Sequence, residues 1–339
     1  MNLDSFNFSL PKSLIAQEAK ALRSDSKLLV INRQTQELID EKFKNLDKFI
    51  SKNDLLIIND TKVIPARLFG KRKKTNGKVE LFVERILSDN SFVCQLKSSR
   101  KLNIGDAIII NDNIELVIKK NDGILCHVSV SNYTVRKLLD NFGKVPLPPY
   151  IAREANKKDK NFYQTIFAKN NGSVAAPTAA LHFDEKTVKK LKKKGIKIAN
   201  ITLHIGMGTF SSIKSKNINE HKMHSELFCI PKDTYDLINQ CKKDKGRVIC
   251  VGTTVARALE SFHGKNYEFD KFYETDIFIK PGYRFEVVDS LITNFHLPQS
   301  SLIIMVAAFY NTEKILNAYK YAIKNKYKFF SYGDSTLIL

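Results

Sequence analysis

The chain has 339 residues, of which 43% are hydrophobic and 27% charged, which is typical of globular proteins and long enough for two domains. It holds no run of roughly 18 apolar residues, and its start lacks the features of a signal peptide, so we expect no membrane span and a cytoplasmic protein. Five scattered cysteines without a C-x-x-C pair argue against a disulfide framework or a zinc ribbon.

The formal net charge of +20 favours a polyanionic partner such as a nucleic acid, because each neutralised phosphate releases counterions. The lysine runs KRKK (71–74) and VKKLKKKG (188–195) are consistent with a surface that follows phosphates. The alternative is that these runs are solvated faces without a partner.

The first sixty residues predict a mixed α/β structure, with strands over 27–32 and 54–60 and a short helix over 45–53. The run DLLIIND (54–60) is continuously apolar, as in a strand buried on both faces. It ends in Asn59, Asp60 and Thr61, where polar groups emerge at the end of a strand.

Residues 66–130 change character. Short β-prone runs follow one another at about ten-residue spacing, separated by turns rich in Gly, Asn and Asp, which predicts a small antiparallel barrel or sandwich. A helix over 133–143 and the proline-rich crossing VPLPPYIARE (145–154) follow. The prediction is a β-domain, barrel or sandwich, inserted at 66–149 within an α/β domain of residues 1–65 and 150–339.

From residue 160 onward, helical and strand patterns alternate, which predicts an α/β layer with parallel strands. The expected helices span 161–170, 184–195, 231–246, 253–262, 300–309 and 312–327. The expected strands span 196–206, 247–252, 275–279 and 285–290.

The segment ITLHIGMGTF (201–210) places His204, Gly206 and Gly208 at the end of a strand. It lacks the third small residue of the G-x-G-x-x-G dinucleotide fingerprint. One interpretation is a glycine turn with a hydrogen-bonded histidine. The other is close approach of the backbone to a ligand, with His204 as acid, base or donor.

The segment VGTTVARALES (251–261) reads as strand, glycine, two threonines and helix. A helix N-terminus favours anions. The alternative is an ordinary helix capped by Thr253 or Thr254, and the pattern favours it. In TNFHLPQSSL (293–302), His296 precedes another helix, and Asp276 is a possible acid–base partner for it. The alternative for Asp276 is a cap or turn residue.

The segment NEHKMHSELF (219–228) places His221 and His224 on one face if it is helical. A metal site can use that spacing, but no third strong ligand is marked. We therefore predict no metal, and a polar ligand contact or a structural role for these histidines.

GSVAAPTAALHF (172–183) carries no charge within a lysine-rich chain and is built of small residues. Together with IINDTKVIPARL (57–68), LPPYI, YQTIFA, TLHIGMGTF, HKMHSE, VGTTVARALES, TDIFIKPG, TNFHLPQSSL and SYGDSTLIL, it closely resembles one family. These are the S-adenosylmethionine:tRNA ribosyltransferase-isomerases of queuosine biosynthesis. The matching segments run from one end of the chain to the other.

The resemblance implies an α/β-barrel-like catalytic domain carrying an inserted antiparallel β-barrel domain. It also implies a reaction that moves the ribosyl part of S-adenosylmethionine onto 7-aminomethyl-7-deazaguanine at the tRNA wobble position. The ribosyl becomes an epoxycyclopentane ring, giving epoxyqueuosine, and adenine and methionine leave. S-adenosylmethionine is then a co-substrate, no metal or other cofactor is involved, and the protein is expected to be a monomer.

This chemistry needs acid and base groups with pKa values near 7, and histidine starts there. The catalytic candidates within matching segments are His182, His204 and His296, with Asp276. The substrate-binding candidates are Arg153, Tyr163, Gln164, Ser173, Thr178, Gly206, Gly208, His224, Glu226, Thr253, Thr254, Arg257 and Asn294. The small neutral loop lets the backbone approach a flat ring, where Ser173 and Thr178 can offer hydrogen bonds.

The chain departs from the family pattern at two positions. Ala180 stands where a glycine is expected, and Phe162 stands where an arginine is expected before the Tyr-Gln-Thr run. The second departure removes a basic contact that Arg153 would have to supply.

Two other functions remain open from sequence. An α/β enzyme acting on a free nucleoside or a small sulfonium compound would leave the lysine runs idle. A non-catalytic RNA-binding protein would use the β-domain, but it would have no need of the Gly/His segments.

Overall fold

The apolar run at 54–60 forms the centre of a large sheet in the computed structural model, which describes residues 1–123, 125–156, 158–210 and 213–339. Strand β3 (Leu55–Asn59) is buried along its whole length. It pairs in parallel with β12 (Lys197–His204) and β14 (Val248–Val251), and β14 pairs in parallel with β16 (Ser290–Asn294). The predicted parallel core is confirmed.

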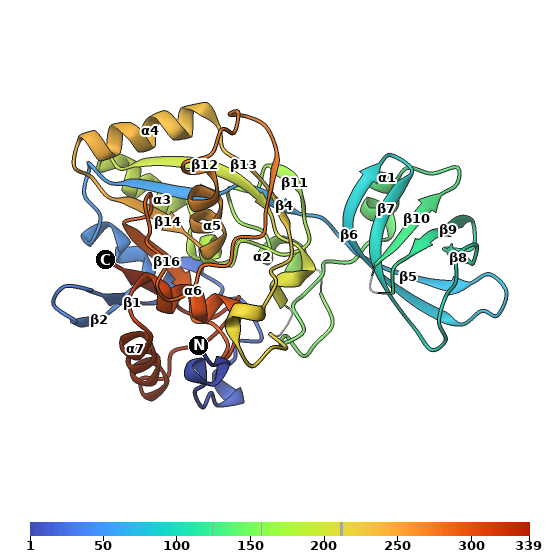
Figure 1. Cartoon of the computed structure of the whole chain (residues 1–339), viewed down its shortest axis with the longest axis horizontal. Helices are drawn as coiled ribbons and strands as arrows, with labels where there is room; N and C mark the ends of the chain where they lie inside the picture. Colours follow the sequence, from blue (N-terminus) through green and yellow to red (C-terminus); the bar gives the residue numbers. More distant parts are fainter. Residues whose placement is uncertain (124, 157, 211–212) are drawn as a thin grey trace.

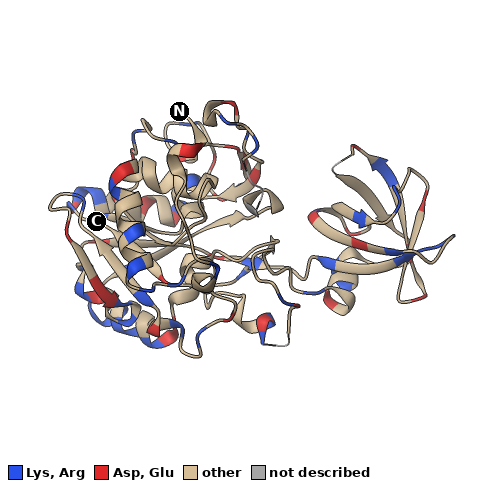
Figure 2. Ribbon diagram, turned by 90° about the horizontal axis from the view of Figure 1, so that it is seen from below, with Lys and Arg blue, Asp and Glu red and all other residues tan. Residues whose placement is uncertain are grey.

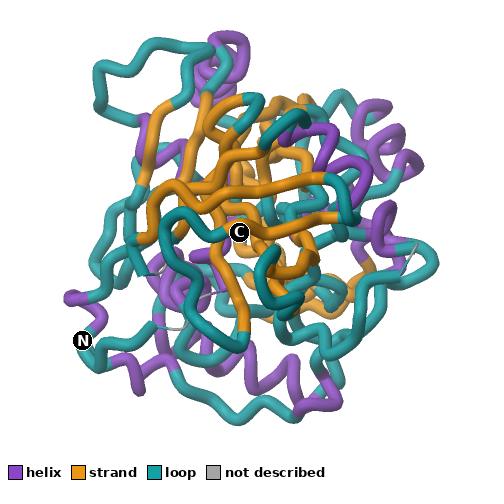
Figure 3. Tube along the Cα trace, turned by 90° about the vertical axis from the view of Figure 1, so that its right-hand side faces the viewer, coloured by secondary structure: helices purple, strands orange, loops and turns teal. Residues whose placement is uncertain are grey.

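Five further strands extend this core into a nine-stranded sheet of order β15-β13-β12-β3-β14-β16-β17-β1-β2. The added strands are β15 (Tyr273–Thr275), β13 (Glu226–Cys229), β17 (Ser335–Ile338), β1 (Lys27–Ile31) and β2 (Leu38–Lys42). A separate two-stranded parallel pair joins β4 (Thr61–Val63) to β11 (Asn170–Ser173). Figure 3, seen from the barrel side, shows strands in the middle with helices toward the periphery.

Side chains that alternate along β3 enter two different cores. Leu55 and Ile57 pack with the helices α4 to α7, whereas Leu56 and Ile58 pack with α3 and the segment around Ala180. The helices are α2 (Asp159–Phe162), α3 (Glu185–Lys193), α4 (Lys232–Lys243), α5 (Thr253–Phe262), α6 (Ser301–Phe309) and α7 (Thr312–Lys324). Short 3-10 helices span Leu3–Phe6, Lys12–Leu14, Arg23–Asp25, Phe43–Lys48, Thr178–His182, Met207–Phe210 and Ile218–Glu220.

The β-rich region forms a closed antiparallel barrel of order β10-β7-β6-β5-β8-β9 (Figure 1). Its strands are β5 (Arg67–Arg72), β6 (Lys78–Ser88), β7 (Ser91–Ser98), β8 (Ala107–Ile110), β9 (Ile114–Asn121) and β10 (Cys126–Val130). Helix α1 (Val135–Phe142) buries Val135, Leu138 and Leu139 against the barrel core. The predicted fold class is confirmed, while the exact domain boundaries at 66 and 149 stay a prediction.

Two strands that the sequence pattern predicted are displaced. The strand expected over 285–290 begins only at Ser290, because the backbone N–H groups of Glu286, Val287 and Val288 donate to the buried Glu260 carboxylate instead of a strand ladder. The strand expected over 275–279 ends at Thr275.

Two expected helices are also different. Only Asp159–Phe162 is helical near the predicted 161–170, and the chain then turns into β11. The short helix expected over 45–53 is the 3-10 helix Phe43–Lys48. Among the described residues, no helix is long and apolar enough to cross a membrane.

Candidate functional site

Four parallel strands end at the same edge of the sheet, at Asn59, His204, Val251 and Asn294. Ligands of α/β proteins bind in the crevice beyond such carboxyl ends. Two adjoining cavities lie there, and Ile205 is part of the wall of both.

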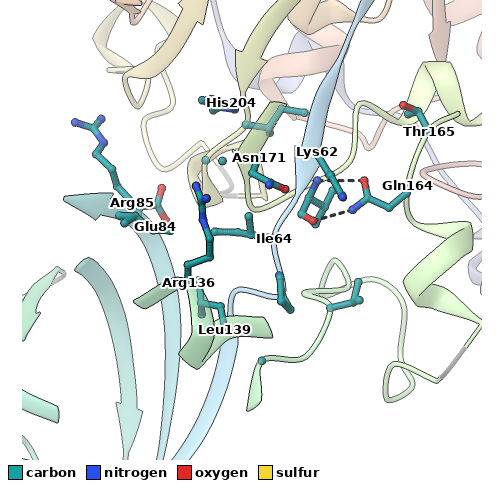
Figure 4. A pocket seen from close by; sticks show the side chains of 18 of the residues that line it. Lys62, Ile64, Glu84, Arg85, Arg136, Leu139, Gln164, Thr165, Asn171 and His204 are labelled. Carbon is teal, nitrogen blue, oxygen red and sulfur yellow. Dashed lines mark hydrogen bonds between the residues drawn. The ribbon is translucent and has the colours of Figure 1, made fainter. Parts of the chain in front are cut away.

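The larger cavity, which we name the charged cleft, has a volume of about 1020 Å³ and lies between the barrel and the sheet domain. Figure 4 shows that Glu84, Arg85, Arg136 and Leu139 enter it from the barrel side, opposite His204, Asn171, Lys62 and Gln164. Its charged lining residues are five cations and three carboxylates: Arg23, Lys62, Arg85, Arg136, Lys160, Glu84, Asp140 and Glu226. The cleft therefore favours an anionic ligand.

The polar run at the end of β3 fixes the cleft wall. Asn59 Nδ2 donates to the carbonyl of Leu203 (2.9 Å), and its Oδ1 accepts from the Leu203 N–H (3.0 Å). Asp60 accepts from Thr202 Oγ1 (2.6 Å) and from Asn200 Nδ2 (2.7 Å). These bonds hold the last residues of β12 in register against β3.

His204 is positioned at the end of β12 by the next residue of that run. Its Nδ1 lies 2.8 Å from Thr61 Oγ1, and its ring is stacked on Phe272 with centroids 5.3 Å apart. Burial lowers the pKa of His204, although Asp60 opposes the shift. The ring is therefore neutral near pH 7, and within the described chain its Nε2 has no hydrogen-bond partner. In the tautomer in which Nδ1–H donates to Thr61 Oγ1, Nε2 can accept a proton.

Two glycines of the predicted segments make room for imidazole rings. A Cβ on Gly172, whose φ is +153°, would lie 2.7–2.8 Å from the ring of His204. A Cβ on Gly208 would lie 2.3–2.5 Å from atoms of His224. The small-residue segment 172–183 thus begins with a glycine because the His204 ring packs directly on it.

Two carboxylates hold the loop that follows His204. Glu226 Oε1 accepts from the Gly206 N–H (3.1 Å), and Glu84 Oε1 accepts from the Met207 N–H (3.0 Å). Glu226 also forms a buried ion pair with Arg257. The loop is therefore held from one side by the sheet and from the other by the barrel.

Sequence reasoning missed Glu84. Its Oε2 is buried without a partner among the described residues, and burial raises its pKa. Glu84 follows the buried Val83 on β6, a segment for which the sequence pattern predicted only a strand of the β-domain. No local signal marks it, because the sequence does not say which side of the barrel faces the sheet domain.

The second cavity, which we name the neutral cavity, has a volume of about 400 Å³. Among the described residues, no Lys, Arg, Asp or Glu is part of its wall. It is lined by Pro149, Tyr150, Tyr163, Ala175, Ala176, Pro177, Thr178, Ala179, Ile205, Thr209, Gly252, Thr253, Thr254, Thr293, Asn294, Phe295, His296, Leu297, Pro298, Gln299, Ser300, Leu302, Phe330 and Ser331.

Two predicted histidines are buried near this cavity. Nε2 of His296 lies 2.8 Å from Thr293 Oγ1, and burial lowers the pKa of His296 to about 3. Burial lowers the pKa of His182 to about 4, and its two ring nitrogens contact Ser26 Oγ (2.8 Å) and Asn294 Nδ2 (3.1 Å). Both rings are neutral at pH 7, and His182 lines neither cavity.

The other predicted site residues fall into three groups. Gln164, Gly206 and Glu226 line the charged cleft with His204, and Gln164 pairs through both amide atoms with the backbone of Val63 (Figure 4). A second group lines the neutral cavity with His296: Tyr163, Thr178, Thr253, Thr254 and Asn294. The rest line neither cavity: Arg153, Ser173, Gly208, His224, Arg257 and Asp276.

Three of these residues have clear partners or surroundings elsewhere. Ser173 is buried, donates to the carbonyl of Ala175 (2.6 Å) and accepts from the Ile205 N–H (2.9 Å). Arg153 forms a bidentate pair with Asp159 at 2.6 and 2.8 Å. Asp276 is exposed, and no hydrogen bond or ion pair joins it to His296 in the described chain.

The helix considered over 219–228 does not form. The 3-10 helix there ends at Glu220, β13 starts at Glu226, and His221 and His224 lie on the loop between them. His221 contacts the edge of Phe278 with ring centroids 5.2 Å apart. Within the described residues, no group of three potential ligands is placed to hold a metal ion.

At Phe162, where the family pattern has an arginine, a cation from another part of the chain lies beside the ring. The Arg23 guanidinium lies 5.9 Å from the centroid of the Phe162 ring and donates to the carbonyls of Gln164 (2.6 Å) and Asn161 (2.8 Å). Ala180 is fully buried in the core behind the sheet.

Comparison with known proteins gives a consistent result. The family model described as "Queuosine biosynthesis protein" matches residues 3–338. The chain is similar to the S-adenosylmethionine:tRNA ribosyltransferase-isomerases of Sulfurihydrogenibium sp. (45% identity, 100% of both chains) and of Coxiella burnetii strain RSA 331 (48% identity, 98% and 97%). It is also similar to the crystal structure of the S-adenosylmethionine tRNA ribosyltransferase from Thermotoga maritima (29% identity, 99% and 100% covered, TM-score 0.57).

The close contact between Gly172 and the His204 ring predicts that a methyl group added at residue 172 disturbs the ring. We expect Gly172→Ala to displace the His204 ring from Thr61 and to change the titration of that ring. NMR of the imidazole protons measures this titration. Gly264→Ala is the matched control, because Gly264 also has a positive φ (+69°) but an added Cβ would meet nothing within 4 Å. An unchanged His204 titration in Gly172→Ala would contradict the packing described here.

The buried histidines predict a loss of stability in acid. Their folded pKa values, about 4 for His182 and about 3 for His296, lie below the value of about 6.5 in an unfolded chain. As the pH falls from about 6.5 to about 4.5, the unfolded chain binds protons that the folded chain does not. Each histidine then removes roughly 1.4 kcal/mol from the free energy of unfolding per pH unit.

Urea unfolding at a series of pH values measures this slope. We expect His296→Asn to lose stability less steeply than the unsubstituted protein over that range, whatever its stability at pH 7. His263→Asn, at an exposed histidine, serves as the control. Equal slopes for all three proteins would show that His296 is not a buried neutral group.

Proposed function

This chain belongs to the queuosine biosynthesis protein family and is an S-adenosylmethionine:tRNA ribosyltransferase-isomerase, and on this premise we propose its substrates and products. It transfers and isomerises the ribosyl moiety of S-adenosylmethionine onto 7-aminomethyl-7-deazaguanine at the tRNA wobble position. The products are epoxyqueuosine in tRNA, adenine and methionine. The observation that carries the proposal is a neutral His204 at the wall of a cationic cleft, whose Nε2 has no hydrogen-bond partner among the described residues.

His204 is the base in this proposal. The sulfonium of S-adenosylmethionine acidifies the neighbouring 5′ carbon, and removal of a proton there requires a neutral acceptor near pH 7. Burial keeps His204 in that state, and the contact of Nδ1 with Thr61 leaves Nε2 for the substrate. The pKa shift places the loss of the basic form below about pH 6.5, so activity should decline there.

The charged cleft is the tRNA site in this proposal. Its cations come from both the barrel and the sheet domain, so an anticodon loop in the cleft touches both. Figure 2 shows that Lys and Arg are also spread over the outer helices and loops, which agrees with the net charge of +20. Long-range attraction then brings tRNA to the surface, and the cleft positions it.

The remaining details of the proposal follow from the same geometry. We expect the protein to act as a monomer. S-adenosylmethionine is a co-substrate, and the proposed chemistry calls for no metal or further cofactor. We place the enzyme in the cytoplasm with its tRNA substrate.

Turnover tests the proposal directly. The protein is mixed with S-adenosylmethionine and a tRNA carrying 7-aminomethyl-7-deazaguanine, adenine is followed by chromatography, and the tRNA nucleosides are analysed by mass. We expect adenine together with an epoxyqueuosine nucleoside. His204→Ala should reduce kcat by roughly 10²-fold or more, because a positioned base contributes that much, while tRNA binding is kept.

Two results would contradict this assignment. Adenine release without tRNA would indicate an enzyme for free sulfonium compounds. Bound tRNA without any adenine would indicate an RNA-binding protein.

The cleft cations predict how tRNA affinity depends on salt. We expect Lys62→Ala and Arg136→Ala each to weaken tRNA binding and to reduce the slope of log K against log salt by about one. Lys193→Ala on α3 is the control from the lysine run at 188–195, outside the cleft. A larger effect at Lys193 than at Lys62 and Arg136 would move the RNA site to α3.

A further inference from the structure

We propose that Glu84 is a positioning residue for the reaction, through which the inserted barrel holds the loop that follows His204. This inference rests on the proposed function, in which His204 is the base, and it deepens that function by giving the barrel a part in turnover besides RNA binding. Glu84 acts through the backbone of the loop and not by contact with the substrate.

A β-bulge in the barrel directs Glu84 toward the sheet domain. Along β6, the pairing with β7 passes from Val83 directly to Arg85, so Glu84 is an extra residue without an opposite partner. Bulges of this kind bend a strand and re-aim a side chain, and they are frequent beside active sites. The Glu84 side chain accordingly enters the wall of the charged cleft from the barrel side (Figure 4).

The backbone N–H groups that follow His204 are held by both domains. The first two donate to groups of the sheet domain, Ser173 Oγ (2.9 Å) and Glu226 Oε1 (3.1 Å). The third, the Met207 N–H, donates to Glu84 Oε1 of the barrel (3.0 Å). Without Glu84, the loop would keep these two bonds to the sheet domain and lose this bond to the barrel.

The absence of a side chain at Gly206 makes the contact possible. A Cβ on Gly206 would lie 2.8 Å from Glu84 Oε1, the atom that accepts from Met207. The end of a glutamate side chain can move away from such a Cβ, but it would then leave the Met207 N–H. We therefore expect Gly206→Ala to break the same hydrogen bond from the loop side.

Apolar contacts join the barrel to both segments that surround His204. Val174 is fully buried in the barrel core, and Met207 packs against that core. The Val174 N–H also donates to the carbonyl of Ile205 (3.0 Å), which ties the two segments together. Since the His204 ring packs on Gly172, two residues before Val174, a shift of the barrel would be transmitted to the ring.

Glu84 occupies a position that costs folding free energy. Its Oε2 is buried without a hydrogen-bond partner in the described chain, and burial raises the pKa of its carboxyl group. An unpaired buried oxygen is destabilising, and proteins accept such costs chiefly at functional sites. This cost is explained if the carboxyl group serves the loop after His204.

Turnover and tRNA affinity test the inference, with kcat measured as adenine release at saturating tRNA and S-adenosylmethionine. We expect Glu84→Ala to lower kcat by about tenfold to hundredfold, because a small misplacement of a reacting group has an effect of this size. The affinity for tRNA should not fall, because no cation is removed. Glu84→Gln keeps an oxygen that can accept from Met207, so it should keep most of the rate.

Glu80→Ala is the matched control, because Glu80 lies on the same strand but pairs with Arg67 within the barrel. Its kcat should equal that of the unsubstituted protein. Gly206→Ala should reproduce the loss in kcat, and its combination with Glu84→Ala should add little more, because both break one hydrogen bond. Gly206→Ala also tests the inference if Glu84→Ala fails to fold.

NMR titration of the His204 imidazole protons tests the inference without turnover. We expect the titration to change in Glu84→Ala and Gly206→Ala but not in Glu84→Gln. Because alanine and glutamine both remove the carboxyl group, a difference between these two variants reports the hydrogen bond to Met207 and not the charge.

The proposal is overturned if Glu84→Ala leaves kcat unchanged or if Glu84→Gln is as slow as Glu84→Ala. It is also overturned if the His204 titration is the same in Glu84→Ala and in the unsubstituted protein. If the unsubstituted protein releases no adenine, the proposed function fails, and the His204 titration alone then decides whether Glu84 positions the loop.

Discussion

The whole site depends on three polar residues buried at the end of one strand. Asn59 locks β3 to β12 by bonding both backbone groups of Leu203, and Asp60 gathers the side chains of Thr202 and Asn200. Thr61 then contacts His204. Because the same run fixes the register of the strands and the orientation of the imidazole, the position of the proposed base follows from the pairing of the central sheet.

The barrel is part of this arrangement through one side chain. Glu84 reaches from β6 to the Met207 N–H, two residues beyond the junction of the two cavities. Glu226 holds the adjacent Gly206 N–H from the sheet side. Any displacement of the barrel would therefore act on the loop after His204, so the inserted domain affects the geometry of the candidate site as well as supplying cations to the cleft.

Sequence patterns predicted the elements that local physics determines. Hydrophobic periodicity and turn or capping residues predicted the apolar run of β3, the barrel strands with their turns, and the helices α3 to α7. Side-chain contacts across the fold decided the rest. The Glu260 carboxylate accepts from backbone amides that a strand over 285–290 would have paired with a neighbouring strand. Glu84 contacts the loop after His204 only because this side of the barrel faces the sheet domain. Placement of His182 behind Asn294 likewise required the tertiary structure.

The two cavities explain why so basic a protein contains a segment without charge. A surface with a net charge of +20 attracts tRNA, but the same field opposes a sulfonium cation. Residues 175–179 line a cavity whose wall, in the part of the chain that the structure describes, contains no cation. Gly172, at the start of the same segment, lets His204 pack at the edge of the cleft. One short uncharged stretch therefore supplies part of the wall of the neutral cavity and the space beside His204 at the edge of the charged cleft.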